Sequence, residues 1–146
     1  MTATFKALRI EETDGVFTKQ FIERNLEDLP QNNTLVKVAY SSLNFKDALS
    51  AYGNKGVTKK YPHTPGIDAV GTIEETTDPN WNVGDKVIVT GFDLGMNTDG
   101  GFAEYVRVPS QWLVILPKNL SELEAMIYGT AGLTAAMCID KLIENG

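Results

Sequence analysis

Cysteine and histidine are almost absent from this sequence. Cys138 is the only cysteine among 146 residues, and His63 is the only histidine. An intrachain disulfide is therefore excluded, and a reducing compartment suits the chain. We expect Cys138 to be a small buried hydrophobe, the alternative being a reactive thiol. We expect His63, in a loop beside Pro62, to have an exposed structural role rather than to bind a metal ion.

Basic residues and long apolar runs are also scarce. Thirteen Lys and Arg against 19 Asp and Glu give a net charge of −6, which argues against a nucleic-acid partner. No apolar run approaches the length that a bilayer requires, and the first residues, MTATFKALRI, lack the apolar centre of a signal peptide. We therefore expect a cytoplasmic protein without a nucleic-acid or membrane partner.

Up to Pro117 the sequence is typical of short strands separated by turns. Apolar alternation between Gly, Pro and Asn residues predicts strands at Phe5–Ile10, Val16–Ile22, Thr34–Tyr40, Ile67–Glu74, Lys86–Gly91, Phe102–Val108 and Trp112–Leu116. The Asp14-Gly15 turn signal predicts that the first two strands form a hairpin. The segment Tyr52–Thr64 contains three lysines and two glycines and predicts a mobile surface loop. The pattern alone indicates a mostly β, α+β domain.

Beyond Pro117 the pattern becomes helical. Ser121 and Glu124 have the spacing of a capping box, which predicts the start of a helix. This helix should break near Gly129. A second helix should then run through Leu133, Ala136 and Met137 and end at the Asn145-Gly146 stop signal.

Five motifs follow one another along the chain. They are SSLNFKDAL at 41–49, PGIDAVGTI at 65–73, GDKV at 84–87, GGFAEY at 100–105 and GTAGLTA at 129–135. In this order they resemble the N-terminal half of a medium-chain dehydrogenase/reductase, and most closely its zinc-free quinone oxidoreductase or acrylyl-CoA reductase branch. The resemblance implies a GroES-like, partly open barrel with C-terminal helices. It divides the chain into a catalytic domain portion over 1–120 and helices over 121–146, which lead into a nucleotide-binding (Rossmann) domain that these residues do not include.

The same resemblance implies NADPH as the cofactor. The glycine-rich motif G-x-G-x-x-G, which binds the pyrophosphate, is absent from these 146 residues. In the family, threonines in the last motif lie at the nicotinamide end of the interdomain cleft. The resemblance therefore implies that Thr130 and Thr134 contact the cofactor. The alternative is that Gly129-Thr130 only ends one helix and starts the next. NADH in place of NADPH stays open, because the residues that distinguish them lie in the other domain.

A comparison with the zinc branch of the family addresses metal binding. Its ligand positions fall here on Asn44, Ile67 and Asp68, so one carboxylate remains where catalytic zinc needs three Cys, His or carboxylate ligands. The segment 90–101 also lacks the cysteine quartet that holds structural zinc in that branch. The resemblance therefore implies a zinc-independent enzyme with no metal ligands.

Without a Lewis acid, the hydride acceptor must already be activated by conjugation, as in enoyl thioesters, enones and quinones. The resemblance makes Asn44 the polar residue that faces nicotinamide and substrate. It makes Phe45, where relatives often have tyrosine, a cofactor contact through packing. Asp47 has either a catalytic role in the cleft or a structural one, accepting backbone N–H groups of the Asn44 loop. Related enoyl reductases use a loop tyrosine as proton donor, but this sequence has Lys55 near the expected position, with Tyr52 and Tyr61 nearby. Tyr52 is the candidate proton donor, and ring packing by Tyr52 and protonation by solvent are the alternatives.

Two hypotheses about function follow. In the first, the chain is the N-terminal half of an NADPH-dependent oxidoreductase that reduces acrylyl-CoA-like enoyl thioesters or quinones, and it is inactive alone. In the second, it is a stand-alone GroES-like binding or interaction domain. The expected partners are a small activated alkene, an enoyl-CoA or a quinone, and further copies of the chain in a homo-oligomer. We also expect an exposed apolar surface that promotes association, over residues 112–116 and Met126, Ile127, Leu133, Ala136 and Met137.

Overall fold

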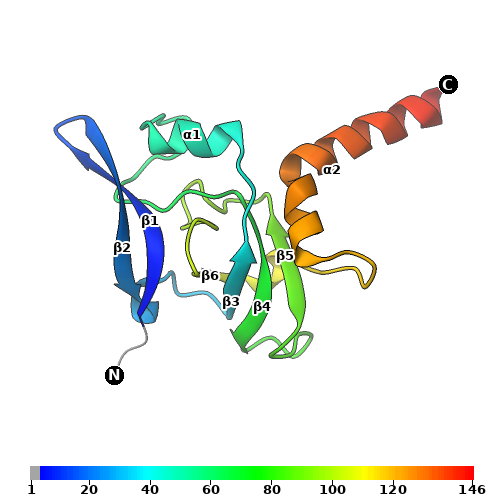
Figure 1. The fold of residues 1–146 in the computed structure, drawn as a ribbon, viewed down its shortest axis with the longest axis horizontal. Coiled ribbons are helices and arrows are strands. Elements are labelled where there is room, and N and C mark those ends of the chain that lie inside the picture. Colours follow the sequence, from blue (N-terminus) through cyan, green and yellow to red (C-terminus); the bar gives the residue numbers. More distant parts are fainter. Residues whose placement is uncertain (1–3) are drawn as a thin grey trace.

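The computed structural model describes residues 4–146, and its strands form two antiparallel sheets (Figure 1). Strands β1 (Thr4–Thr13) and β2 (Val16–Asn25) pair as a hairpin. The other sheet has five strands in the order β6-β3-β4-β5-β7. Their bounds are Thr34–Tyr40 for β3, Asp68–Thr76 for β4, Lys86–Thr90 for β5, Tyr105–Val108 for β6 and Leu113–Ile115 for β7. The predicted mostly β fold is confirmed, and the described strands do not close into a complete barrel.

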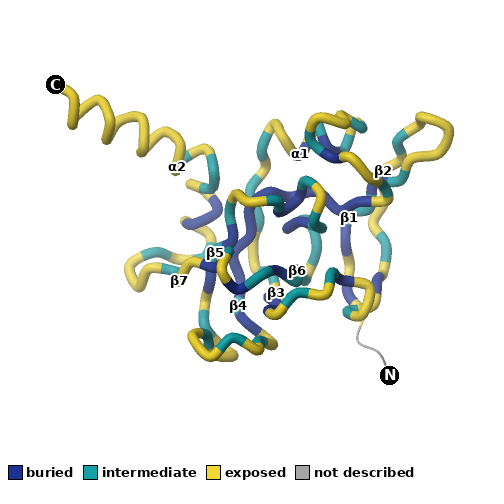
Figure 2. Tube along the Cα trace, turned by 180° about the vertical axis from the view of Figure 1, so that it is seen from behind, coloured by how far each residue is buried: buried dark blue, intermediate teal, exposed yellow. Residues whose placement is uncertain are grey.

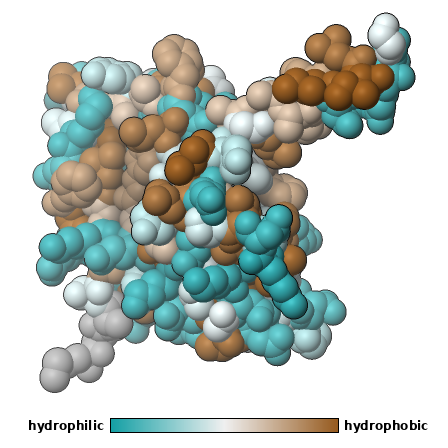
Figure 3. Space-filling model, turned by 45° about the vertical axis from the view of Figure 1, so that its right-hand side comes forward, coloured by the Kyte–Doolittle hydropathy of each residue, from teal (hydrophilic) through white to brown (hydrophobic). Residues whose placement is uncertain are grey.

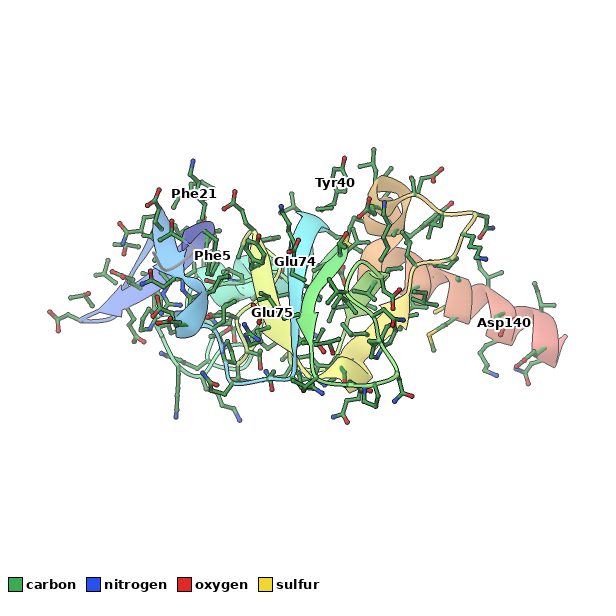
Figure 4. All side chains as sticks on the ribbon, turned by 90° about the horizontal axis from the view of Figure 1, so that it is seen from below. Phe5, Phe21, Tyr40, Glu74, Glu75 and Asp140 are labelled. Atoms are coloured by element: carbon green, nitrogen blue, oxygen red, sulfur yellow. The ribbon has the colours of Figure 1, made fainter. Side chains whose placement is uncertain are left out.

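Alternating apolar side chains of these strands build the core. One cluster in the five-stranded sheet contains the fully buried Val36, Ile73, Val87 and Val106. A second cluster, around Phe5 and Leu35, joins the hairpin to this sheet. Figure 2 shows the buried residues concentrated along the strands, and Figure 4 shows Phe5 between the two sheets while Phe21 projects outward. Each buried side chain of this size contributes about 1.5–3 kcal/mol, so the two clusters form a stable platform for the connecting segments.

Three short helical segments lie among these strands, and the sequence analysis did not predict them. They are η1 (Leu26–Asp28), α1 (Phe45–Ala51) and η2 (Ser110–Trp112). Helix α1 is too short to show a full helical repeat in the sequence. It forms because the Asp47 side chain accepts the backbone N–H of Asn44, the residue that precedes the helix, at 2.8 Å.

Helix α2 (Glu122–Asn145) begins and bends where the sequence predicted. The Ser121 hydroxyl accepts the backbone N–H of Glu124 at 3.2 Å, and the Glu124 carboxylate accepts the backbone N–H of Ser121 at 2.9 Å. At Gly129 the backbone leaves helical geometry, with φ of 50°. The first half of α2 packs on the sheet through Ala125 and Met126, whereas the second half projects away from it (Figure 1).

The projecting half of α2 exposes most of its apolar side chains. Figure 3 shows hydrophobic residues gathered along it, and they include Leu133, Met137, Ile139, Leu142 and Ile143. The exposed members of the surface expected from the sequence are Val114, Ile115, Ile127, Leu133, Ala136 and Met137. Met126 and Leu113 are buried, because they pack against the sheet, so the prediction was wrong for these two. Association through this surface stays a prediction.

Two further expectations about this helix need correction. Cys138 is exposed rather than buried, because it lies on the projecting half. By length and composition alone, α2 could cross a membrane: it has 24 residues, and an 18-residue window has a mean hydropathy of 1.2. The statement that no apolar run approaches this length was therefore wrong. The absence of a membrane partner stays a prediction, and the packing of Ala125 and Met126 ties the helix to the sheet.

His63 is buried, which contradicts the exposed role expected for it. Its ring contacts the backbone oxygen of Gly95 through Nε2 at 2.9 Å, and its Nδ1 lies 3.7 Å from the Asp99 carboxylate. Asp99 also accepts Arg24 at 2.6 Å and the backbone N–H of Thr64 at 3.0 Å. This cluster joins the hairpin to two loops of the larger sheet. The segment 52–64 is thus a surface loop only in its first part.

The burial of His63 predicts acid-sensitive stability. Burial lowers the pKa of His63 below its ordinary value of 6.5, and this effect outweighs the contacts with Gly95 and Asp99, which raise it. Below about pH 6.5 the unfolded chain then binds more protons than the folded one. The free energy of unfolding should therefore decrease as the pH is lowered. Melting temperatures at pH 7.5 and 5.5 should show a smaller acid loss for His63→Gln than for the wild type. Equal losses would contradict the prediction, since Asp47 and Asp68 are present in both proteins.

Candidate functional site

Asp68, the first residue of β4, is the centre of a polar cluster that includes two residues selected from the sequence, Asn44 and Thr130. Its carboxylate accepts the side-chain amide of Asn44 at 2.9 Å, the backbone N–H of Thr130 at 2.9 Å and the Thr130 hydroxyl at 2.6 Å. The hydroxyl of Thr90, at the end of β5, is a further donor to it. The Thr90 and Thr130 hydroxyl oxygens lie 2.8 Å apart. The cluster thus connects the start of α1, two strands and the bend in α2.

The bend at Gly129 brings Thr130 to Asp68. A Cβ atom at Gly129 would lie 2.8 Å from a carboxylate oxygen of Asp68 and 2.5 Å from the hydroxyl oxygen of Ser42. The positive φ of Gly129 is also unfavourable for other residues. Ser42 secures the turn before the bend by donating to the backbone oxygen of Met126 at 2.6 Å. Glycine is therefore required here for steric and conformational reasons together.

Asn44 is held from two sides. Its side-chain N–H donates to Asp68, and its backbone N–H donates to Asp47, which is buried. The other carboxylate oxygen of Asp47 accepts the backbone N–H groups of Gly66 and Ile67, at 3.1 and 2.9 Å. An amide has two N–H donors and a carbonyl oxygen. The Asp68 contact uses one donor, so Asn44 has hydrogen-bonding capacity left for a ligand.

The two buried carboxylates differ in acidity. Burial raises the pKa of Asp47 above its ordinary value, although hydrogen bonds from three backbone N–H groups and from the Asn44 side chain oppose this effect. Burial acts in the same direction on Asp68, but hydrogen bonds from Thr130, Thr90 and Asn44 together lower the pKa of Asp68 below its ordinary value. Asp68 is thus a stable anion whose charge is spread over its donors, and it is better suited to fixing Asn44 than to exchanging protons.

Other residues selected from the sequence lie farther from Asp68. Phe45, next to Asn44, is 80% exposed, so its side chain is accessible to a ligand. Thr134 is exposed on α2, one turn beyond Thr130, and its hydroxyl donates to the backbone oxygen of Thr130 at 2.8 Å. Tyr52 follows α1 at the opposite end from Asn44, and this residue is 75% exposed. The structure therefore brings together Asn44, Asp47 and Thr130 but does not place Tyr52 beside them.

Sequence reasoning missed Asp68 and Thr90 as members of the site. The sequence analysis treated Asp68 only as the remaining ligand position of a lost zinc site. A carboxylate in an otherwise apolar strand is, however, a signal of a buried polar group with hydrogen-bond partners. Nothing in the sequence around Thr90 distinguishes it from other threonines that end strands. Its role follows from the pairing of Asp68 with Thr90 in the β4–β5 register.

An apolar groove of about 400 Å³ begins beside this cluster. Thr90 and Gly129 lie at its polar end. Its other walls come from β5, β7, α2 and the segment before α2, and are formed by Ile88, Val114, Leu120, Ala125, Met126, Tyr128, Gly132, Leu133 and Ala136. The small residues Gly132 and Ala136 keep this part of α2 narrow. The site therefore combines a fixed polar cluster with an adjoining apolar surface.

Whether the site could bind a metal ion depends on the side chains that are grouped there. Among residues 4–146, no three His, Cys, Asp or Glu side chains are grouped so as to hold a metal ion. We predict that the purified protein contains no stoichiometric zinc and keeps its melting temperature in EDTA, because Asn44 and Ile67 do not replace thiolate and imidazole ligands. Elemental analysis measures the first and circular dichroism the second. One zinc per chain, or a chelator-induced loss of fold, would refute the prediction.

Comparison with known proteins supports a specific family. The alcohol dehydrogenase GroES-like domain matches residues 30–118. YhfP of Bacillus subtilis, which carries the name of a quinone oxidoreductase, is 44% identical over the whole chain, and the acrylyl-CoA reductase AcuI of Ruegeria pomeroyi is 39% identical over 97% of it. The chain covers 44% of each of these proteins, so it spans less than half of their length.

Solved structures agree with these relatives. The crystal structure of YhfP with NAD bound matches with a TM-score of 0.95 and 44% identity, over 99% of this chain and 44% of that one. The YhdH oxidoreductase of Salmonella enterica in complex with NADP matches with a TM-score of 0.92 and 41% identity, over 95% and 43%. Residues 30–118, which contain the five-stranded sheet, are therefore a GroES-like domain of the alcohol dehydrogenase type. The chain belongs to the medium-chain dehydrogenase/reductase family, in which it corresponds to the N-terminal half of quinone oxidoreductase and acrylyl-CoA reductase members.

Proposed function

We propose that this chain is the substrate-side half of an NADPH-dependent oxidoreductase that reduces activated C=C bonds, as in acrylyl-CoA-like enoyl thioesters, or quinones. The observation that carries the proposal is the Asn44–Asp68–Thr130 cluster, which fixes an amide between α1 and the bend of α2. The relatives named for acrylyl-CoA and quinone reduction, and the neighbours with NAD or NADP bound, support it.

The residues around the cluster fit the nicotinamide end of a cofactor. The exposed ring of Phe45 offers an apolar face, and the exposed hydroxyl oxygen of Thr134 can accept a hydrogen bond. Thr130 already donates to Asp68 through both its N–H and its hydroxyl, so it would contact a cofactor through its oxygen lone pairs. NADPH, when bound, would supply the hydride. The domain division, with a nucleotide-binding domain following residues 121–146, is part of this proposal.

In the proposed reaction Asn44 stabilises charge on the substrate. Addition of hydride at the electron-poor carbon of an enoyl thioester places negative charge on the carbonyl oxygen. The second amide N–H of Asn44 would donate to this oxygen, while Asp68 holds the amide in place through the first N–H. The α-carbon then takes a proton, from solvent or from Tyr52. Because Tyr52 lies at the far end of α1 from Asn44, its role as proton donor depends on a substrate that reaches along the helix.

The proposal can be tested by measuring NADPH oxidation by the full-length parent, with acrylyl-CoA and with a small quinone as acceptors. We expect turnover with at least one acceptor and none for the 146-residue chain alone, since the dinucleotide-binding motif is absent from this chain. A parent that reduces neither acceptor would favour the other hypothesis, a GroES-like binding or interaction domain. Tyr52→Phe should lower turnover only if its hydroxyl supplies the proton.

A further inference from the structure

The outer edge of β2 is a strand edge without a partner. Strand β2 has 10 residues and pairs only with β1, and the described residues 4–146 provide no backbone partner on its other side. It lies on the side of the hairpin that faces away from the five-stranded sheet (Figure 1). An exposed strand edge of this length is a template for pairing with another chain. The hairpin therefore offers its outer edge to a further strand.

The register of the hairpin shows which backbone groups line this edge. Leu8 and Ile10 of β1 donate their backbone N–H groups to other segments, both at 2.8 Å, and therefore point them away from β2. Their partners across the hairpin are Phe21 and Lys19. Because directly opposite residues of an antiparallel pair share this orientation, Phe21 and Lys19 point their N–H and C=O groups to the outer edge. Glu23, two residues further along β2, has the same orientation.

The side chains of Lys19, Phe21 and Glu23 lie on one face of β2, because alternate residues of a strand point to the same face. All three residues are exposed, and Phe21, in the middle, is 81% exposed. Figure 4 shows the Phe21 side chain projecting from the hairpin. A basic, an aromatic and an acidic residue thus follow one another along this face, and each of them presents backbone groups at the free edge.

We infer that β2 pairs antiparallel with β2 of a second copy, about a twofold axis that passes between the two Phe21 residues. A twofold axis makes both copies use the same edge, and in this register it places Lys19 of each copy opposite Glu23 of the other. Two opposite-charge pairs and one aromatic pair form, and pairs of both kinds stabilise an antiparallel sheet. The backbone groups of all three residues form hydrogen bonds across the interface.

Other registers match this edge less well. An axis at Lys19 or at Glu23 would place like charges opposite each other, which is destabilising. An axis at Gln20 or Ile22 would place a charged residue opposite Phe21. A lysine on an edge strand usually hinders pairing, but in the Phe21 register each Lys19 lies opposite a carboxylate. The charge pattern therefore favours a second copy of this chain over an unrelated strand.

Disulfide cross-linking tests the register. In a Cys138→Ser background, which removes the native thiol, Phe21→Cys should form a covalent dimer on oxidation with copper phenanthroline. The two Cα atoms of a hydrogen-bonded pair are about 5.5 Å apart, within the range of a disulfide. Val16→Cys is the matched control: it is exposed on the same strand, but its two copies lie roughly 33 Å apart in this register. A mixture of Lys19→Cys and Glu23→Cys should cross-link, whereas each of them alone should not.

Sedimentation velocity of the 146-residue chain tests the charge pairs. Lys19→Glu and Glu23→Lys should each raise the dissociation constant of the dimer about tenfold, because two attractive pairs become repulsive, a change of about 1.4 kcal/mol. The exchange Lys19→Glu/Glu23→Lys should restore the wild-type value, since both pairs return with reversed sign. Lys19 also lies over the Tyr52 ring, with Nζ 3.9 Å from its centre. That contact is lost in Lys19→Glu and in the exchange variant alike, so the recovery reports the contact between copies.

Three results would overturn the proposal. They are equal cross-linking of Phe21→Cys and Val16→Cys, no cross-linking in the mixture of Lys19→Cys and Glu23→Cys, and an exchange variant that associates no better than the single charge variants. Association through the exposed half of α2 alone would leave all the charge variants like the wild type, and this result would also contradict the pairing of β2. The pairing does not depend on the proposed reaction, because none of these residues belongs to the Asp68 cluster.

Discussion

Replacement of Asp68 by alanine is expected to lower the free energy of unfolding by about 3–5 kcal/mol, because several donors lose their common acceptor and each unsatisfied buried group costs about 1–3 kcal/mol. Asp68 is fully buried, and its donors come from Asn44, Thr90 and Thr130. For a chain of this size, the melting temperature should fall by roughly 10 °C or more. Thermal denaturation followed by circular dichroism measures this change.

Two further variants show whether the loss of stability in Asp68→Ala comes from the hydrogen bonds of the Asp68 carboxylate. Asp68→Asn preserves the shape of the side chain and one acceptor oxygen but loses the charge, so its loss of stability should lie between those of wild type and Asp68→Ala. Asp140→Ala is the control, since Asp140 is exposed on the projecting half of α2 (Figure 4) and should change the melting temperature little. Equal melting temperatures for Asp68→Ala and Asp140→Ala would show that the cluster does not stabilise the fold.

Replacement of Asn44 by alanine in the full-length parent is expected to lower turnover with the preferred acceptor strongly. A transition-state hydrogen bond of this kind contributes about 2–4 kcal/mol, which corresponds to a loss of tens-fold to several hundred-fold. The backbone N–H of Asn44 still donates to Asp47 in this variant, so α1 should persist. Steady-state NADPH oxidation measures the loss, with acrylyl-CoA and a small quinone as acceptors.

Asp47→Ala separates a role in catalysis from a role in stability. Because Asp47 accepts the backbone N–H groups of Asn44, Gly66 and Ile67, this variant should lose both melting temperature and turnover. Asn44→Ala should lose turnover with a much smaller decrease in melting temperature. Unchanged turnover of Asn44→Ala on both acceptors would contradict the catalytic role proposed for Asn44.

Much of the fold could be predicted from local pattern. The strand at Thr34–Tyr40 was predicted with its observed bounds, and the other six strands were placed with errors at their ends. Period-two alternation is visible wherever one face of a strand packs on the core. The capping box at Ser121 and the break at Gly129 were equally local signals. Helix α1 gave no such signal, because it has only seven residues and is fixed by an Asp47 side chain that binds amides about 20 residues away.

Burial of single residues was predicted less well. His63 is buried because the hairpin and two loops meet around Asp99, and Cys138 is exposed because the second half of α2 leaves the sheet. Neither fact follows from the neighbours of these residues in the sequence. Both depend on which segments the fold brings together.

The sequence by itself determined the mostly β fold, the ends and bend of the long helix and the family, and it selected Asn44, Asp47 and Thr130 as candidate site residues. Local periodicity and motif order contain this information. Only the tertiary structure decided that Asp68 joins Asn44 to Thr130, that Thr90 belongs to the same cluster, and that Tyr52 stands apart. The reason is physical: the donors of Asp68 lie 22 to 62 residues away along the chain, and strand pairing and the bend at Gly129 bring them within hydrogen-bond distance.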